Sequence, residues 1–516
     1  MFRKKTILAV AAATTLLAAG CSGGGSNTAA TGSSGGSGGS AGGTLTLGLI
    51  VPATTFSAAD MNFANESPYG QAVFDSLLKA DPSGKVGPAL AKEWSYNDTK
   101  TVLTMTLRDD VTFTDGTKFN AAAAAQNLIR FRDGQSPNKA FLSALQDAKA
   151  VDDTHLQLTL KDSDPGLLGH LSQNAGMMES PAAFNASDIK TNPVGSGPFV
   201  LDQKDTVIGT TYTFTKNTKY WDPSSQHYDK LVLKVLRDPT AMLNAIKGHQ
   251  LNGAKLANND TVDQVKGAGY TLNPLELDWT GLLLLDRDGK MNPAIKDVRV
   301  RQAMNYAFDK AGLLKAQGKG YGTVTGQIFP TKSAAYDPAL DTRYNYDPAK
   351  AKSLLAEAGY SNGFELAMPR TAAQGTTVWT LIEQQLKDIG ITVKYTDAGT
   401  NFIADVLTPK YAVSWLALQQ DPDWPLINFE ITPNATFNPF HTTDPKVTEL
   451  VKAVHDAKTD ADAAPALKQL NAYIVEQAWF APWYRIQSNF ATDAQTNVQM
   501  QSDNTIPYLW NFTPKS

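Results

Sequence analysis

Apolar and polar positions alternate in several stretches of this 516-residue chain. The first stretch, 44–51, opens an ordered body. In the stretch 101–107, leucine and methionine lie on one side and threonine on the other, as in a half-buried strand. Further strands are expected near 155–160, 212–215, 231–236 and 391–395, with short strand-like pieces around Phe490 and Leu509.

Apolar residues spaced three and four apart predict helices, and several of these have capping residues in the expected places. Asn120 should cap a helix that runs through 132. Asp347 precedes Pro348, and Gly359 follows the expected end of the same helix. Further helices are expected near 239–247, after Asp297, over 379–389, and as two segments between 449 and 479. The alternation of helix and strand in the second half favours an α/β fold.

The first residues have the pattern of an export signal. Three basic residues at 3–5 precede an uncharged, mostly apolar run over 6–17, and small residues then lead to Cys21. A run of about a dozen residues is too short to span a membrane permanently, which is typical of a secretory signal peptide. The ending Ala18-Ala-Gly-Cys21 resembles the lipobox of bacterial lipoproteins, with its leucine one position early. This resemblance implies removal of 1–20 and lipidation of Cys21; the alternative is an ordinary signal peptide with an incidental cysteine.

Composition limits the possible partners of the rest of the chain. Residues 22–43 are almost entirely Gly, Ser, Thr and Ala, the composition of a flexible tether. The body that begins at Thr44 is long enough for two or three domains. Without the three leader cations, 43 of the 46 basic residues stand against 50 acidic ones, which argues against nucleic acid as a partner. Cys21 is the single cysteine, so no disulfide is expected, and no second stretch is apolar enough to span a membrane.

Motifs for enzyme chemistry are missing. The six histidines have no metal-ligand spacing, and the chain has no Walker loop or GxGxxG motif. Asp421 and Asp423 would point the same way on one extended segment and could form a carboxylate pair for acid/base chemistry. A secreted hydrolase therefore stays open as an alternative, although no nucleophile motif accompanies the pair. No cofactor and no metal are expected.

Six segments follow one another in an order that is informative: Pro88-Ala-Leu-Ala-Lys-Glu-Trp94, Leu107-Arg-Asp-Asp-Val-Thr-Phe-Thr-Asp-Gly-Thr-Lys-Phe119, Pro193-Val-Gly-Ser-Gly-Pro-Phe199, Lys216-Asn-Thr-Lys-Tyr-Trp221, Asp297-Val-Arg-Val-Arg-Gln-Ala303 and Tyr346-Asp-Pro-Ala-Lys-Ala-Lys-Ser-Leu-Leu-Ala-Glu-Ala-Gly-Tyr360. In order and spacing, from about Thr44 to the C-terminus, they resemble the family 5 extracellular solute-binding proteins of bacterial ABC transporters. That group includes oligopeptide, dipeptide and nickel receptors. Two departures are Ala123, where the family usually has Asp, and 249–252, where Glu-Val-Asp is common.

The resemblance implies an α/β, two-lobed, periplasmic-binding-protein-like fold of type II, cluster C. Lobe I would carry an extra subdomain, and a hinge would join the lobes, which close over a ligand held between them. Mapped by motif, the expected parts are a signal peptide (1–20), the lipidated cysteine and linker (21–43), lobe I (44–79, 191–282 and 484–516), its extra subdomain (80–190) and lobe II (283–483).

The resemblance also indicates charged ligand-binding residues. The stretch from Trp415 to Trp424 resembles the family segment that supplies an aspartate for a peptide's α-amino group, and both Asp421 and Asp423 are candidates. Arg370 resembles the arginine that meets a carboxylate in dipeptide receptors. A zwitterion taken out of water needs charged partners at both ends, so an aspartate for the amino group and Arg370 for the carboxylate are consistent with each other.

Four tryptophans are candidates for the walls of the cleft. Trp415 and Trp424 flank the aspartates, and Trp279 and Trp483 lie near the expected hinge crossings. Their flat rings could cover the apolar parts of a ligand. The alternative is that these tryptophans belong to the core and that the aspartates are turn residues.

The resemblance therefore implies a lipid-anchored, extracytoplasmic receptor that captures a solute and delivers it to the permease subunits of an ABC importer. A short peptide is the expected solute; the alternative is a non-peptide solute such as an aromatic or amphipathic compound, a sugar or a metal chelate. No enzyme activity is expected. The protein should act as a monomer, held through Cys21 on the outer face of the cell membrane or in the periplasm.

Overall fold

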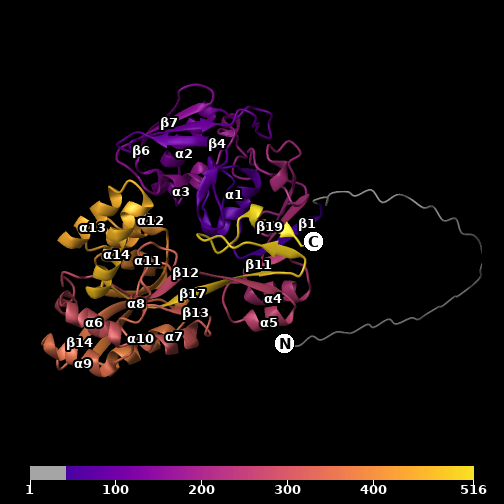
Figure 1. Cartoon of the computed structure of the whole chain (residues 1–516). Helices are drawn as coiled ribbons and strands as arrows, with labels where there is room; N and C mark the ends of the chain where they lie inside the picture. Colours follow the sequence, from indigo (N-terminus) through magenta and orange to yellow (C-terminus); the bar gives the residue numbers. More distant parts are fainter. Residues whose placement is uncertain (1–41, 516) are drawn as a thin grey trace, which may run out of the picture. The chain divides into compact units, whose positions relative to one another are not determined.

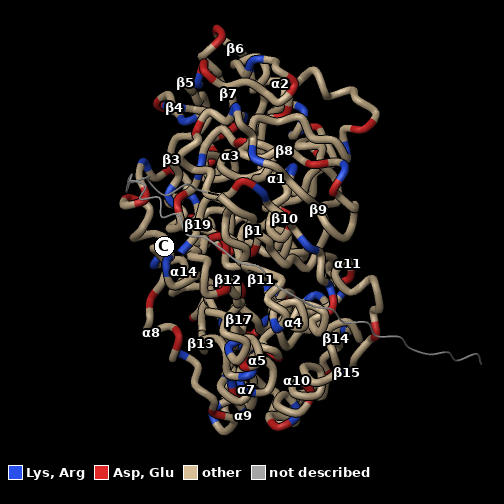
Figure 2. Tube along the Cα trace, turned by 90° about the vertical axis from the view of Figure 1, so that its right-hand side faces the viewer, with Lys and Arg blue, Asp and Glu red and all other residues tan. Residues whose placement is uncertain are grey.

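The computed structural model of the chain describes residues 42–515. The expected signal peptide 1–20, the lipid attachment at Cys21 and nearly all of the linker 21–43 lie outside these residues. Among the described residues, no helix combines the length and apolarity that a membrane span needs. Positively and negatively charged residues are interspersed along the described part of the chain (Figure 2).

The largest sheet within residues 42–515 has nine strands, in the order β16-β12-β17-β11-β1-β10-β9-β8, with β13 also paired to β17. The parallel pairing of β1 with β10 and β11 is flanked by antiparallel pairs, so the sheet is mixed. Its strands are β1 (Thr44–Leu49), β8 (Phe199–Leu201), β9 (Thr211–Lys216), β10 (Lys230–Val235), β11 (Gly253–Lys255), β12 (Thr271–Leu284), β13 (Gly322–Val324), β16 (Val413–Gln419) and β17 (Phe480–Thr492).

A second, antiparallel sheet has the strand order β4-β5-β7-β6 and is covered by α2 (Ala121–Asp133). Alternate residues such as Leu103 and Leu158 enter a shared core with Leu128 of α2, which explains the period-2 pattern of these strands. The four strands are β4 (Ala91–Tyr96), β5 (Val102–Leu107), β6 (Leu145–Ala150) and β7 (His155–Leu160). Three two-stranded sheets complete the strands of the described residues: β2 (Leu78–Ala80) with β3 (Val86–Pro88), β14 (Phe364–Arg370) with β15 (Ile391–Asp397), and β18 (Thr496–Val498) with β19 (Phe512–Pro514).

Helices begin at the capping residues that the sequence indicates. The side chain of Asn120 accepts a hydrogen bond from Ala123 N (2.9 Å), and Asp347 accepts one from Lys350 N (2.8 Å), so both helices start as predicted. The helix that Asp347 caps is α9 (Pro348–Glu357). The other α-helices are α1 (Ser67–Val73), α3 (Leu167–Leu171), α4 (Pro239–Lys247), α5 (Val262–Gly267), α6 (Val298–Tyr306), α7 (Lys310–Gln317), α8 (Pro338–Asp341), α10 (Thr377–Asp388), α11 (Phe402–Val406), α12 (Asp423–Leu426), α13 (Pro445–His455) and α14 (Asp460–Glu476).

Two long strands, β12 and β17, connect separate hydrophobic cores. At one end, Trp279 and Trp483 belong to a core shared with α6, α9 and α10. At the other end, Leu272 packs against the core around α4 and α5, and Phe490 enters a core shared with α1 and β10. In both views the region with β4–β7 and the region with α7, α9 and α10 lie on opposite sides of these strands (Figures 1 and 2). A change in the twist of β12 and β17 would therefore move one set of cores against the other.

Two parts of the expected secondary structure differ from the structure. The region around Phe490 is not a short piece but part of the 13-residue strand β17, which also contains Pro482 and Trp483. Leu509 begins a 3-10 helix, and the short strand expected around it is β19, which begins three residues later at Phe512. The sequence pattern does not predict the 14-residue strand β12, because its half before Leu277 alternates poorly and its other half is buried almost throughout.

Candidate ligand-binding site

The site is built where β12, β16 and β17 lie side by side. Asp278 of β12 pairs with Gln419 on one neighbour and with Ile486 on the other. Just beyond β16, Gln420 N donates to Leu277 O (2.6 Å), and its side-chain amide donates to the carbonyl of a neighbouring loop. These bonds fix the chain direction at the point where the Asp-Pro-Asp segment leaves the sheet.

Asp421 is the first residue of that segment. Its carboxylate accepts a hydrogen bond from Gln419 Nε2 (2.7 Å) and is half-buried. Burial raises the pKa of Asp421 to about 7; the hydrogen bond from Gln419 opposes this shift, and the carboxylates of Asp278 and Asp503 add to it. No lysine or arginine in residues 42–515 forms an ion pair with Asp421. Its negative charge is thus desolvated and without a cationic partner.

Asp278, Asp421 and Asp503 form a group that we call the acidic cluster. They come from β12, from the end of β16 and from the loop before β19, and the charges of Asp278 and Asp503 act on Asp421. Burial raises the pKa of Asp278 and of Asp503; Lys255 opposes the shift for Asp278, and hydrogen bonds including those from Gln173 and Tyr508 oppose it for Asp503. Among the described residues no group of three or more His, Cys, Asp or Glu side chains is arranged to hold a metal ion.

Asp423 does not lie beside Asp421 as expected. It is the first residue of α12, and its carboxylate accepts a hydrogen bond from Ser333 Oγ. Burial raises the pKa of Asp423, while this hydrogen bond opposes the shift. The prediction that both carboxylates point the same way from one extended segment is wrong, because the chain turns into a helix after Pro422.

Arg370 lies at the exposed end of β14. Its guanidinium is 5.5 Å from the ring centre of Tyr395, and its strand neighbour in β15 is Asp397. No hydrogen bond or ion pair within residues 42–515 joins Arg370 to the acidic cluster or to Asp423. The structure thus places Arg370 in a separate two-stranded sheet and gives it surface that a solute can reach.

Three of the four candidate tryptophans are buried. Trp279 and Trp483 have no exposed surface, and Trp279 Nε1 donates to Glu430 (3.4 Å). Trp415 packs edge-on against Trp379, with ring centres 5.4 Å apart. These positions favour the core alternative for Trp279, Trp483 and Trp415, because the large core already covers their faces.

Trp424 is half-buried and lines a cavity of about 290 Å³ together with Asp162 and Trp479. Its ring centre is 5.2 Å from that of His455 at the end of α13. His455 Nε2 is 2.9 Å from Ser163 Oγ, which follows β7. The cavity is therefore bordered both by the segment after Asp423 and by the end of the four-stranded sheet.

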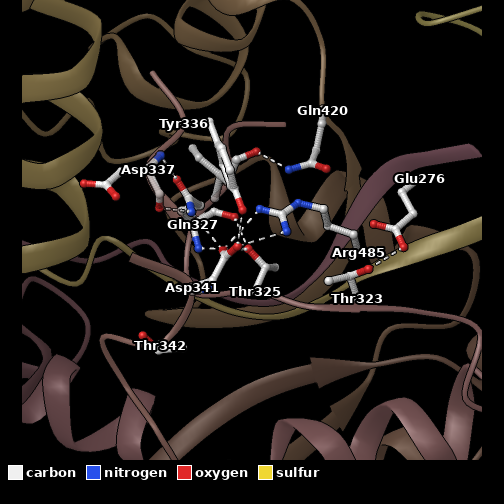
Figure 3. Close-up of polar contacts among 12 residues, drawn as sticks. Glu276, Thr323, Thr325, Gln327, Tyr336, Asp337, Asp341, Thr342, Gln420 and Arg485 are labelled. Carbon is white, nitrogen blue, oxygen red and sulfur yellow. Dashed lines mark hydrogen bonds and ion pairs between the residues drawn. The ribbon is translucent and has the colours of Figure 1, made fainter. Parts of the chain in front are cut away.

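A buried polar network lies behind the site and ties β17 to the segment from β13 to α8 (Figure 3). Arg485 exposes 1% of its side chain and pairs with Asp341 (3.2 Å). Asp341 also accepts hydrogen bonds from Thr325 Oγ1 (2.7 Å), Gln327 Nε2 (2.8 Å) and Tyr336 OH (2.7 Å). Burial works against it, but these donors and the Arg485 guanidinium hold the pKa of Asp341 below its usual value.

The raised pKa of Asp421 predicts that the ligand-free protein loses stability as the pH rises from about 4 to about 7. The folded carboxyl titrates near 7 instead of 3.8. Between these values the folded state holds a proton that the unfolded state releases, so stability falls with increasing pH. Asp75 and Glu179, whose pKa values burial raises to about 6 and about 7, act in the same direction. The measurement is the unfolding temperature as a function of pH for wild type, Asp421→Asn and the exposed-site control Asp397→Asn. Only Asp421→Asn should show a smaller pH dependence than wild type. Equal pH slopes in all three proteins would contradict the prediction.

The fold, with separate cores joined by two long strands, is that of a two-lobed binding protein, and comparison with known proteins identifies the class. The model of the family described as Bacterial extracellular solute-binding proteins, family 5 Middle, matches residues 85–444. The chain belongs to this family, whose members are solute-binding receptors of ABC importers and not enzymes. The hydrolase alternative is therefore set aside.

Individual proteins agree with this assignment. The chain is 28% identical over 485 residues to the glutathione-binding protein GsiB of Shigella dysenteriae serotype 1 (strain Sd197), covering 86% of this chain and 92% of that protein. HbpA2 from Haemophilus parasuis has a TM-score of 0.80 at 21% identity, covering 92% of this chain and 100% of that one. The periplasmic binding protein DppA from Helicobacter pylori, solved with the peptide STSA, has a TM-score of 0.74 at 18% identity, covering 92% and 98%. The structural likeness confirms the expected α/β, two-lobed fold.

Three charged residues do not emerge from the sequence pattern: Asp278 and Asp503, which belong to the acidic cluster, and Lys255, whose charge acts on Asp278. A charge flanked by large apolar side chains, as in Leu277-Asp278-Trp279, is a signal that could have indicated Asp278. Lys255 and Asp503 have no comparable signal, because Asp503 lies among polar residues and Lys255 follows a run of small ones. Their place at the site depends on the folded chain alone.

Proposed function

We propose that this protein captures a short peptide, or another solute with an ammonium group, and delivers it to the membrane subunits of an ABC permease. The observation that carries this proposal is the carboxylate of Asp421, which is desolvated, lies near two other carboxylates and has no cationic partner in residues 42–515. A bound ammonium would supply the missing charge through a charge-assisted hydrogen bond. The glutathione bound by GsiB and the peptide bound by DppA agree with such a solute.

Within this proposal Asp421 binds the ammonium, with Asp423, two residues further along the chain, as a second polar contact. Trp424 covers an apolar part of the solute, since it is the candidate tryptophan with open surface on a cavity. Arg370 can meet an anionic group at the rim. Trp279, Trp415 and Trp483 support the site from the core behind it.

The solute would lie between lobe I (44–79, 191–282 and 484–516), with its extra subdomain (80–190), and lobe II (283–483). Strands β12 and β17 would form the hinge because they run from one set of cores to the other. The bond between Ser163 and His455, and those of Lys100 Nζ to Ala457 O (2.9 Å) and Lys458 O (3.1 Å), would hold the closed form.

The proposal also includes the anchor and the location. Removal of 1–20 and lipidation of Cys21 would hold a monomer on the outer face of the cell membrane, or keep it in the periplasm, with 22–43 as a tether. More than one acyl chain is needed for stable attachment. Such tethering would keep the receptor near its permease.

The first experiment is native mass spectrometry of the purified protein to identify a co-purified ligand. Calorimetry with STSA and with N-acetyl-STSA then tests the ammonium directly, because acetylation removes only that charge. We expect STSA to bind more tightly. Equal affinity for both peptides would contradict the ammonium proposal, and a co-purified sugar or metal chelate would favour the non-peptide alternative.

A further inference from the structure

Lys255, the last residue of β11, is a buried cation without a partner. It exposes 6% of its surface, and burial lowers the pKa of its ammonium to about 8. Throughout residues 42–515, no hydrogen bond and no ion pair within 4.0 Å involves this ammonium. A largely buried ammonium that has no acceptor from the protein depends on solvent or on a ligand for its hydrogen bonds, so its retention at this position needs a reason.

The pairing of the strands shows which way Lys255 faces. Lys255 lies opposite Phe490 of β17, and Asp278 lies opposite Ile486, four residues further along the same strand. Residues four apart on a strand point to the same face of a sheet, and paired residues share that face. The side chains of Lys255 and Asp278 therefore leave the same face, and their charges act on each other without direct contact. Since Asp278 belongs to the acidic cluster, Lys255 lies on the same face of the sheet as the site that contains Asp421.

Another buried lysine shows what a purely structural role looks like. Lys310 is as buried as Lys255, with 5% exposed, but its ammonium donates to Thr325 O (3.1 Å) and its charge lies near Asp341. Arg370, the other cation considered for the site, is exposed and lies over Tyr395. Among these three cations, only Lys255 combines deep burial, a missing partner and the face of the acidic cluster.

We propose that Lys255 binds a carboxylate of the captured solute. The inference rests on the proposed function, in which Asp421 binds the ammonium of the same solute. A carboxylate provides the acceptor that the Lys255 ammonium lacks, and the opposite charges of a zwitterion then face Lys255 and Asp421. The carboxylate is the C-terminus of a peptide or an acidic side chain.

The test compares STSA with its C-terminal amide, STSA-NH2, by calorimetry on the purified protein. If the C-terminus is the source of the carboxylate, wild type should bind STSA roughly 10- to 100-fold more tightly than the amide, the size expected for a charged hydrogen bond. Lys255→Met should bind both peptides with the weaker affinity, whereas the matched control Lys310→Met should keep the wild-type ratio. A Lys255→Met protein that still prefers the acid by the wild-type ratio would overturn the inference.

A third peptide distinguishes the two sources of the carboxylate. STSD-NH2 has an acidic side chain and no C-terminal charge. If the side chain is the source, wild type binds STSD-NH2 more tightly than STSA-NH2, and Lys255→Met removes this difference. If the C-terminus is the source, the two amides bind alike in both proteins. In either case the effect depends on Lys255.

Two controls separate this inference from the proposed function. N-acetylalanine has a carboxylate and no amine. If it raises the unfolding temperature of wild type but not that of Lys255→Met, the inference is supported even if no free-amine peptide binds. A lack of stabilisation by N-acetylalanine, together with equal affinities for STSA and STSA-NH2 and equal affinities for STSD-NH2 and STSA-NH2, would overturn it. Lys255→Met should unfold at the same temperature as wild type or a higher one, because it removes a desolvated charge. A lower unfolding temperature would instead indicate a structural ion pair and count against the inference.

Discussion

Replacing Asp421 by alanine is expected to weaken the binding of STSA by about 2–5 kcal/mol, or roughly 30-fold to several thousandfold. In the proposed complex the peptide ammonium would be desolvated beside Asp421, and this carboxylate would offset its loss of hydration. Without Asp421, the only carboxylates of the acidic cluster left for the ammonium would be Asp278 and Asp503. Asp503 already accepts hydrogen bonds from Gln173 and Tyr508. Calorimetry on the purified variant measures the loss.

Two comparisons show whether the loss comes from the charge at this position. Asp421→Asn keeps the shape and removes the charge, so it should lose nearly as much affinity for STSA as Asp421→Ala and little for N-acetyl-STSA. Asp423→Asn should lose less, because the Asp423 carboxylate already has a donor in Ser333. If Asp423→Asn loses more than Asp421→Asn, the ammonium lies at Asp423 and the assignment to Asp421 is wrong.

Local features of the fold could be predicted because they depend on neighbouring residues. The helix after Asn120 and the helix between Asp347 and Gly359 start and end where capping residues predict, because an N-cap satisfies backbone groups two or three residues away. The strand β12 was not predictable in this way. Its second half is buried on both faces, so that half has no polar alternation to mark it.

The site was only partly predictable for the same reason. The Asp421 segment is contiguous and has a family resemblance, so the sequence indicates it. Asp278, Asp503 and Lys255 come together with it through strand pairing and a C-terminal loop, and each is more than 80 positions from Asp421 in the sequence. Nothing local in the sequence encodes that arrangement.

The tryptophans illustrate a second limit of the sequence. A wall of a binding cleft and a core both need large apolar side chains, so composition cannot separate them. Only burial distinguishes Trp279, which has no exposed surface, from Trp424, which lines a cavity. The arrangement of three buried tryptophans behind one accessible tryptophan indicates that the site is held by a rigid core. The polar network beside β17 has the same effect.

Replacing Asp341 by alanine is therefore expected to destabilise the protein by about 3–5 kcal/mol. The substitution leaves the Arg485 guanidinium, 1% exposed, without its counter-charge, and it leaves the donors of Thr325, Gln327 and Tyr336 without an acceptor (Figure 3). Urea unfolding followed by circular dichroism measures the loss. Glu365→Ala, which breaks the exposed pair between Lys394 and Glu365, is the matched control and should cost at most about 1 kcal/mol.

Adding Arg485→Met to Asp341→Ala should restore part of the lost stability. The double variant removes the uncompensated guanidinium, and the methionine side chain fills much of the same volume beside Tyr336. Arg485 is on β17, one of the three strands on which the site is built. Asp341→Ala should therefore also weaken STSA binding, because the site loses rigidity. The double variant should recover part of the stability and part of the affinity for STSA. A double variant less stable than Asp341→Ala would show that Arg485 contributes through its packing and not through its charge. The unpaired Arg485 guanidinium would then not be the cause of the destabilisation in Asp341→Ala.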